Sequence, residues 1–224
     1  MSKNAGRKSA ATGGSLCFHD VRIALAGRRL IDLDTCIGPG EVLTVMGPSG
    51  CGKSSLLAYV AGFLDPAFDA SGNITLGGRK ITELPAEARK VGLLFQDALL
   101  FPHMSVGGNL AFALPHDPMM NAALRKARIE EALAEAGLSG MADRDPATLS
   151  GGQQSRVALM RVLLAHPSAL LLDEPFSKLD SELRQQIRDF VFAEAKSRQL
   201  PVLLVTHDPA DAAAAGGRVI ELTG

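Results

Sequence analysis

The chain contains short apolar runs, each followed by a polar or glycine-rich segment. Four such runs are Val42–Met46, Val91–Phe95, Ala169–Leu172 and Val202–Val205. Uninterrupted apolar runs of this length are typical of strands that are buried on both faces. Because helical segments separate the strands along the chain, the pattern predicts an α/β fold whose sheet is mostly parallel.

A stretch of different character lies between the second and the third of these strands. Two helix-breaking prolines, Pro115 and Pro118, are followed by apolar residues at helical spacing from Ala122 to Ala136, and Gly137 ends the pattern. We therefore expect a helical subdomain, roughly residues 98–160, inserted into the α/β core.

Two further segments complete the predicted fold. After the third strand, apolar residues between Leu183 and Val191 recur on one face of a helix that Asp180 or Ser181 is suited to cap. Residues 16–44 and 72–81 are punctuated by glycine and partly alternating, which favours an antiparallel β region.

The composition narrows the class of protein. With 224 residues, 46% hydrophobic and 21% charged, the chain can bury a large core, and we expect one domain over residues 16–224. A formal net charge of -1 provides no broad basic surface, so nucleic acid is not an expected partner. The apolar runs are far shorter than the roughly 20 residues that span a bilayer, so if the protein works at a membrane, another subunit supplies the span.

The N-terminus and the cysteines add no site to this picture. Residues 1–15 are basic and then small and polar where a signal peptide needs an apolar stretch, so we expect a disordered leader. Cys17, Cys36 and Cys51 are too few and too poorly spaced for a disulfide framework, and no spacing indicates structural zinc. Reduced thiols, as in a cytoplasm, are expected.

A glycine-rich loop follows the first buried strand and precedes a predicted helix that begins at Ser55. The loop consists of Gly47, Pro48, Ser49, Gly50, Cys51, Gly52, Lys53 and Ser54. This is the Walker A spacing, in which backbone N–H groups and the helix N-terminus bind phosphate. We expect the loop residues and Ser55 to bind the nucleotide, with Lys53 neutralising the β- and γ-phosphates and Ser54 ligating Mg²⁺. A plain glycine-rich turn is the alternative.

Three other buried strands end in residues suited to phosphate chemistry. Asp173 and Glu174 follow the third strand, where we expect Asp173 to hold Mg²⁺ and Glu174 to polarise the attacking water. His207 follows the fourth strand and is placed to donate to the γ-phosphate and steady that water. Gln96 follows the second strand and offers an oxygen to Mg²⁺ or to the same water. An acidic cap at a strand end is the alternative reading of the carboxylates.

A further motif gives the set its family resemblance. Ser150, Gly151, Gly152 and Gln153 follow Leu149, and Ser177 to Asp180 forms another short motif after Glu174. Together with the Walker A loop, in this order, these motifs closely resemble those of ATP-binding-cassette (ABC) ATPases over residues 16–222. The resemblance implies an ATPase with a P-loop NTPase core that uses ATP and Mg²⁺.

The resemblance also implies how two copies cooperate. In the family, the signature serine and glycines cap the γ-phosphate bound to the Walker A loop of the opposite subunit. Ser150, Gly151, Gly152 and Gln153 are then nucleotide-binding residues, as is Asp180 of the following motif. The resemblance therefore implies a head-to-tail homodimer, or a pair with a homologous cassette, that buries two ATP molecules and needs the dimer to hydrolyse them.

Residues 95–103 and 173–177 resemble importers of the thiamine, iron(III), molybdate and polyamine type. That branch implies an energy-coupling subunit on the cytoplasmic face of a membrane, bound to a permease and working with a solute-binding protein. The apolar residues Leu99, Leu100 and Phe101 suit a socket for the permease, and a core role is equally compatible with them. Two rival functions remain: a soluble ABC ATPase without transport, and a mechanical ATPase that acts on lipoproteins or the division machinery.

One departure from the family concerns the base of the nucleotide. The family usually stacks adenine on an aromatic residue just after the first strand, whereas this chain has Leu25 or Ala26 there. Arg28 or Arg29 is the substitute that the local sequence offers. We therefore expect weak adenine selectivity, because base–aromatic stacking contributes roughly 1 to 3 kcal/mol.

Overall fold

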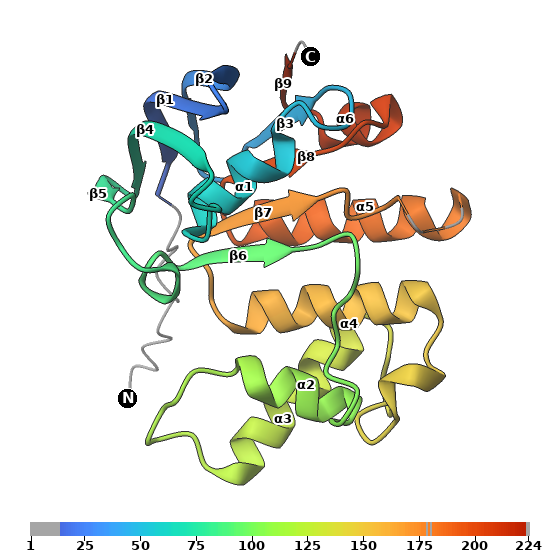
Figure 1. Ribbon diagram of the computed structural model, residues 1–224. Helices are drawn as coiled ribbons and strands as arrows, with labels where there is room; N and C mark the ends of the chain where they lie inside the picture. The colour runs from blue at the N-terminus through green and yellow to red at the C-terminus, as the bar shows by residue number, and fades with distance from the viewer. Residues whose placement is uncertain (1–13, 178, 180, 223–224) are drawn as a thin grey trace, which may run out of the picture.

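The computed structural model describes residues 14–177, 179 and 181–222. Nearly all of the expected leader, as well as Lys178 and Asp180, lies outside this range. The described chain forms two sheets and a group of helices, arranged in layers (Figure 1).

The first sheet is antiparallel and covers one side of the molecule. Its four strands lie in the order β2-β1-β4-β5. They are β1 (Leu16–Leu25), β2 (Arg28–Ile37), β4 (Phe68–Leu76) and β5 (Arg79–Lys80). The expected antiparallel region is confirmed, although β4 begins at Phe68, four residues before the predicted start.

The second sheet is parallel and lies at the centre. Its strands are β3 (Val42–Met46), β6 (Val91–Leu94), β7 (Ala169–Asp173), β8 (Val202–Val205) and β9 (Arg218–Glu221), in the order β6-β7-β8-β3-β9. The α/β fold with a parallel and an antiparallel sheet is thereby confirmed. The prediction that residues 42–44 belong to the antiparallel region is wrong, because β3 pairs in parallel with β8 and β9.

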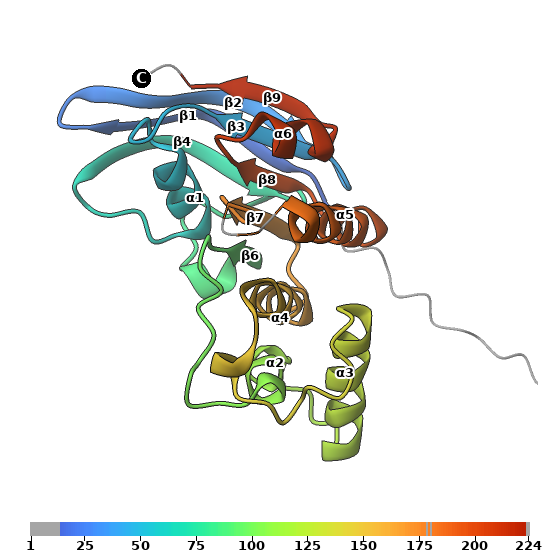
Figure 2. The same ribbon diagram turned by 90° about the vertical axis from the view of Figure 1, so that its right-hand side faces the viewer.

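The helices cover both faces of the parallel sheet. They are α1 (Lys53–Ala61), α2 (Val106–Ala113), α3 (Ala122–Glu135), α4 (Gly151–Leu164), α5 (Ser181–Ser197) and α6 (Pro209–Ala215). Figure 2 shows α2, α3 and α4 grouped on the side away from the antiparallel sheet. Within the described residues, no helix has both the length and the apolar composition that a bilayer span requires.

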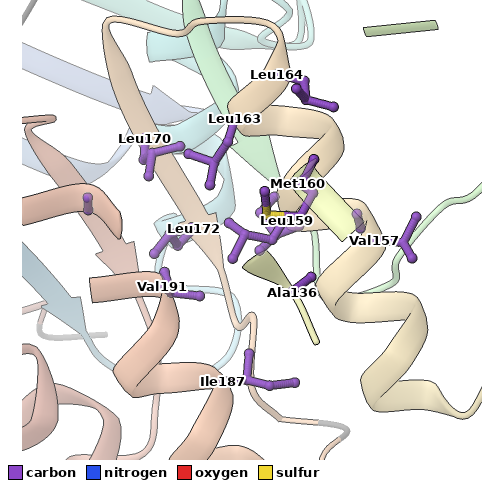
Figure 3. Close-up of a cluster of buried hydrophobic side chains, with 14 of the residues drawn as sticks. Ala136, Val157, Leu159, Met160, Leu163, Leu164, Leu170, Leu172, Ile187 and Val191 are labelled. Atoms are coloured by element: carbon purple, nitrogen blue, oxygen red, sulfur yellow. The ribbon is translucent and has the colours of Figure 1, made fainter. Parts of the chain in front are cut away.

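Two hydrophobic clusters lie on opposite faces of the parallel sheet. Leu170 and Leu172 of β7 belong to the cluster that packs against α2 to α5, where Leu159 and Leu163 approach them (Figure 3). Ala169 and Leu171, which alternate with them, belong to the cluster that includes α1 and the antiparallel sheet. This alternation explains why β7 reads as an uninterrupted apolar run, since both of its faces are buried.

The expectation of three free thiols is wrong for two of them. Cys17 of β1 and Cys36 of β2 form a disulfide, whereas Cys51 is free and buried. The antiparallel register places these two cysteines directly opposite each other, with their Cα atoms 4.0 Å apart. Spacing along the sequence does not reveal this proximity, because it follows from the pairing of the strands.

Candidate functional site

The candidate site lies at the carboxyl edge of the parallel sheet. There β3 leads into the glycine-rich loop, β7 ends at Asp173, and β8 is followed by His207. Since β8 lies between β7 and β3, the three strand ends are neighbours. Ligands of open parallel sheets bind at this edge, so the topology brings together residues that are up to 160 positions apart.

The glycine-rich loop needs glycine for steric and conformational reasons. Gly52, with φ +97°, is the N-cap of α1, and a Cβ there would lie 2.9 Å from Leu30 Cβ. A Cβ on Gly47 would lie 2.8 Å from the carbonyl oxygen of Leu222. The Lys53 side chain folds back over the loop, where its Nζ donates to the carbonyl oxygens of Gly47 and Pro48 at 2.8 and 2.9 Å.

Ser54 and Asp173 form the oxygen-rich part of the site. The Ser54 hydroxyl donates to Asp173 Oδ1 at 3.4 Å, from the first turn of α1 to the end of β7. Burial raises the pKa of Asp173 above its usual value and nearby Glu174 adds to the rise, while the Ser54 hydrogen bond and Lys53 oppose it. Magnesium prefers oxygen ligands and is commonly held by one or two carboxylates plus phosphates, so this pair fits such an ion.

The shifted Asp173 pKa predicts how stability depends on pH. Because the ionised form is disfavoured in the folded chain, folding stability falls as pH rises from the ordinary aspartate pKa through the raised one. Asp173→Asn removes that loss, so the nucleotide-free variant should match or exceed the parent in free energy of unfolding at neutral pH. Urea denaturation at several pH values measures this effect.

The exposed Asp69 on β4 provides a matched control for that experiment. Asp69→Asn should change the free energy of unfolding little, because its side chain is exposed. A lower stability of Asp173→Asn at neutral pH would mean that the Ser54 hydrogen bond outweighs the cost of burying the carboxylate.

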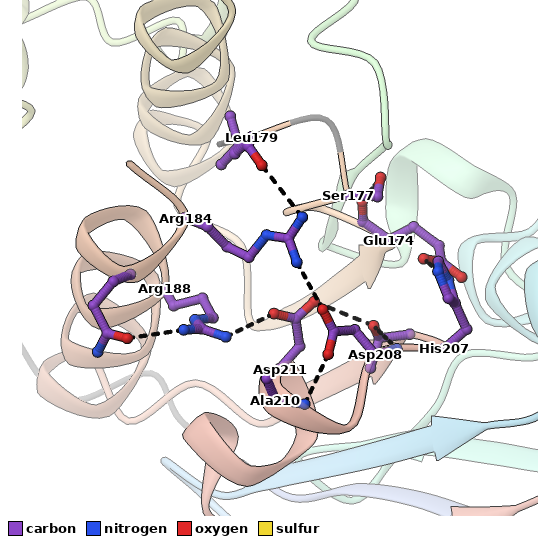
Figure 4. Close-up of polar contacts among 11 residues, drawn as sticks. Glu174, Ser177, Leu179, Arg184, Arg188, His207, Asp208, Ala210 and Asp211 are labelled. Atoms are coloured by element: carbon purple, nitrogen blue, oxygen red, sulfur yellow. Dashed lines mark hydrogen bonds and ion pairs between the residues drawn. The ribbon is translucent and has the colours of Figure 1, made fainter. Parts of the chain in front are cut away.

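Glu174 and His207 are in direct contact. Glu174 Oε2 lies 2.6 Å from His207 Nδ1, and the Glu174 side chain is 18% exposed against 67% for His207 (Figure 4). The backbone of Glu174 has φ +48°, a conformation that non-glycine residues adopt rarely and mostly where the surroundings enforce it. Its N–H donates to the carbonyl of Val205, which fixes the start of this turn against β8.

A network of ion pairs anchors the turn that carries His207. Arg184 of α5 donates to Asp208 Oδ2 at 2.7 Å and to the carbonyl of Leu179 at 3.2 Å. Arg188 pairs with Asp211 at 3.0 Å, and Asp211 also accepts from the hydroxyl of Thr206. The residues before and after His207 are thus tied to α5 and, through Arg184, to the segment that follows Glu174 (Figure 4).

The loop and the strand ends enclose a cavity of about 410 Å³. Its polar lining consists of Ser49, Gly50, Gly52, Lys53, Ser54, Ser55, Asp173 and Glu174, and its apolar lining of Leu25, Leu30 and Phe68. Gly47, Pro48 and Cys51 belong to the loop but not to this lining. Gln96 is exposed beyond β6 and does not line the cavity either.

The predicted signature residues lie outside this cavity, at the start of α4. Ser150 is the N-cap: its hydroxyl accepts from the Gln153 N–H, while the Gln153 side chain accepts from the Ser150 N–H. Accepting that bond leaves the hydroxyl hydrogen free to donate. A Cβ on exposed Gly151 meets no atom within 4 Å, so the front of this helix end is open. Asp180 lies outside the described residues.

Comparison with known proteins agrees with these motifs. The family model described as ABC transporter matches residues 30–177. The chain belongs to the ABC transporter family. Its relatives include YnjD, named an uncharacterized ABC transporter ATP-binding protein, from Escherichia coli K12, at 48% identity over 88% of this chain and 90% of YnjD. Membership confirms the predicted ABC-type ATPase and its role as the energy-coupling, ATP-binding subunit of a transporter.

Two other relatives of this ABC ATPase have more specific names. The Fe(3+) ions import ATP-binding protein FbpC of Agrobacterium fabrum is 43% identical over 92% of this chain and 58% of its own length. The spermidine/putrescine import ATP-binding protein PotA of Frankia alni is 44% identical over 86% of this chain and 40% of its own length. The chain thus spans nearly all of YnjD and about half of the two importer subunits.

The sequence motifs did not single out several residues of this site. Arg184, Arg188 and Asp211 hold the His207 turn, and Phe68 contributes to the cavity wall. The signal for Asp211 is a carboxylate in the first turn of α6, four residues after the histidine. Phe68 gives no motif at all, because only the pairing of β4 with β1 brings it to the cavity.

Proposed function

We propose that this ABC ATPase drives a binding-protein-dependent importer of a small solute, as a homodimer at the cytoplasmic face of a membrane, attached to permease subunits. Two features support the proposal: a nucleotide cavity lined by Lys53, Ser54, Asp173 and Glu174, and a largely apolar cavity beside the segment that follows Gln96. The names of FbpC and PotA, which both denote import ATP-binding proteins, favour an importer over other transporters.

The phosphates of ATP bind where the loop N–H groups and the N-terminus of α1 converge. Lys53 exchanges its bonds with the loop carbonyls for bonds with the β- and γ-phosphates. Ser54 and Asp173 would hold Mg²⁺, with Gln96 as a further candidate oxygen ligand. When bound, Mg²⁺ would neutralise part of the charge on the phosphates.

Glu174 and His207 act on the attacking water. The Glu174 carboxylate polarises the water, and His207, held against it at 2.6 Å, donates to the γ-phosphate. The Arg184 and Arg188 ion pairs keep His207 in reach of that position by fixing Asp208 and Asp211. The unusual backbone of Glu174 aims its side chain toward His207, which supports a functional reason for that conformation.

A second copy completes the site in this proposal. One chain has one Walker loop and one signature segment, and the signature lies outside the chain's own cavity. The end of α4 presents the Ser150 hydroxyl, the N–H groups of Gly151 and Gly152 and a favourable dipole to the γ-phosphate held by the partner. Gln153 supports it by locking the capping box.

The observation that carries the transport proposal is a second cavity, of about 800 Å³. It is lined by residues of β6, of the segment after Gln96 and of the helical segment, among them Phe101, Phe112 and Arg161. Phe112 is 66% exposed and packs edge-on against Phe101. The Arg161 guanidinium lies over the Phe101 ring, 5.2 Å from the ring centroid. An exposed aromatic beside a cavity of this size suits a helix of a permease.

Association with the permease tests the proposal. Wild-type protein should co-purify with the permease that it energises and support solute uptake, and Phe112→Glu should lose most of both because it places a charge in the docking cavity. ATPase activity of the isolated Phe112→Glu variant should stay within about twofold of wild type, since the nucleotide cavity is separate. Uptake assays and co-purification from membranes measure these effects.

Met119→Glu is the matched control, because Met119 is 84% exposed and does not line the cavity. It should behave like the wild type. Recovery of the protein only from the soluble fraction would favour a soluble ABC ATPase. Attachment to lipoprotein or division proteins without solute uptake would favour the mechanical alternative, and either outcome would overturn the import proposal.

A further inference from the structure

The two sides of the nucleotide cavity differ in chemistry. The polar side comes from the glycine-rich loop, α1 and β7, which carry the groups suited to phosphate and Mg²⁺. The apolar side comes from the antiparallel sheet and consists of Leu25, Leu30 and Phe68. A nucleotide has the same two-part character, a charged triphosphate and a flat base, so the apolar side is where the base belongs.

Among the described residues that line the cavity, Phe68 is the single aromatic. It is the first residue of β4 and pairs directly with Leu25, the last residue of β1. Residues directly opposite in an antiparallel pair project to the same face of the sheet. The ring is partly buried against the cluster that includes α1 and the antiparallel sheet, which leaves part of its surface for a ligand.

The position of Phe68 is fixed by the turn that precedes it. The Asp65 side chain accepts from the Ala67 N–H at 2.8 Å, and the Asp65 carbonyl accepts from the Phe68 N–H at 3.0 Å. Aspartate turns of this kind preset the chain direction. The aromatic ring is therefore held at the cavity before any ligand arrives, which reduces the entropy lost on binding.

The arginines that the sequence offered as substitutes are placed less well. Arg29 forms an ion pair with Asp32 at 2.7 Å, and neither Arg28 nor Arg29 lines the cavity. Arg28 is exposed and pairs with Leu25 from the other neighbouring strand, β2. The structure thus offers an aromatic ring where the sequence near the end of β1 shows none.

We propose that Phe68 is the surface on which the adenine ring of ATP stacks, with Leu25 and Leu30 as apolar neighbours. The base is thus held by β4 instead of by the end of β1. The inference rests on ATP binding at the Walker loop and needs neither the permease nor transport. Because stacking is tolerant of base identity, Phe68 distinguishes a nucleotide from a bare polyphosphate and discriminates weakly between purines.

Binding measurements on the isolated chain test this assignment. Phe68→Ala should raise the Kd and KM for ATP by about 5- to 150-fold, the range that loss of one base–aromatic stack predicts. The kcat should change by less than about twofold, since the ring is remote from the reacting phosphate. Affinity for inorganic tripolyphosphate, which has no base, should not change. Isothermal titration and ATPase assays provide these values.

Related substitutions separate the ring from its packing. Phe68→Leu keeps much of the apolar volume but should bind ATP as weakly as Phe68→Ala, whereas Phe68→Tyr should bind like the parent. The chain has no tryptophan, so Phe68→Trp introduces a single indole whose fluorescence ATP should quench and tripolyphosphate should not. Phe63→Ala is the control, because Phe63 is 51% exposed on the preceding loop and does not line the cavity.

Two results would overturn the assignment. One is an unchanged ATP affinity in a folded Phe68→Leu variant. The other is an equal loss of ATP and tripolyphosphate binding, which would show that Phe68 merely supports the loop. A failure of the transport proposal leaves the assignment untouched, because none of these measurements involves a permease; conversely, loss of stacking leaves permease association intact.

Discussion

Replacing Glu174 with glutamine is expected to lower the ATPase rate by about 10²-fold or more, the usual effect of removing one group that acts on the transition state. Glutamine keeps the volume of the side chain and can still hydrogen bond to His207, but it cannot polarise water as a carboxylate does. ATP binding should persist, because Lys53, Ser54 and the glycine-rich loop are unchanged. A phosphate-release assay and nucleotide binding together measure both effects.

The same variant reports on the second copy. With hydrolysis blocked, ATP should hold Glu174→Gln as a dimer in light scattering. Adding Gly151→Asp should abolish that dimer without lowering the melting temperature. Within one copy, a side chain at Gly151 extends into open space, so the fold is unaffected. In the proposed dimer, the same side chain would place a negative charge against the phosphate that the partner binds. Near-normal turnover of Glu174→Gln would remove Glu174 from the proposed mechanism, and a monomer at high concentration with ATP would contradict the shared site.

Asp211→Ala is expected to destabilise the protein by about 3 to 5 kcal/mol, because it leaves the Arg188 charge buried without its partner. Asp211 is 2% exposed and Arg188 8%, so water cannot replace the lost carboxylate. For a chain of this size the loss corresponds to a decrease of about 6 to 20 °C in melting temperature. The turn before α6 should loosen as well, since Asp211 also accepts from Thr206.

Urea denaturation of two further variants gives this prediction its controls. Glu83→Ala removes half of an exposed ion pair with Lys80 and should change stability by less than about 1 kcal/mol. Replacing both buried partners, Arg188→Met with Asp211→Leu, should recover part of the loss because no charge then remains buried. If Asp211→Ala proves as stable as Glu83→Ala, the buried pair does not support the His207 turn.

The motifs and the apolar runs predicted much of this molecule, because each depends on local sequence. Strands β3 and β8 match their predicted bounds, since uninterrupted apolar residues leave little choice of boundary. The parallel sheet then implied that Asp173, Glu174 and His207 would meet at one edge. The 2.6 Å contact between Glu174 and His207 is the geometric outcome of that topology.

Features that depend on strand register could not be predicted in this way. The pairing of Cys17 with Cys36, and of Phe68 with Leu25, requires knowing which residues of two strands lie opposite each other. The short strand β9 and helix α6 lack a distinctive pattern, since α6 consists largely of alanine. The roles proposed for Gln96 and Asp180 remain predictions; Gln96 does not line the cavity, and Asp180 lies outside the described residues.

Strand β7 sits between two other strands and between two hydrophobic clusters, and this position decides what kind of fluctuation can reach the reacting groups. Its backbone amides are released to solvent only when both layers separate, which amounts to unfolding the whole chain. Helix α3, on the periphery, can fray and re-form many times without such an event. The backbone amide of Asp173, at the end of β7, is therefore expected to be among the slowest to exchange with solvent.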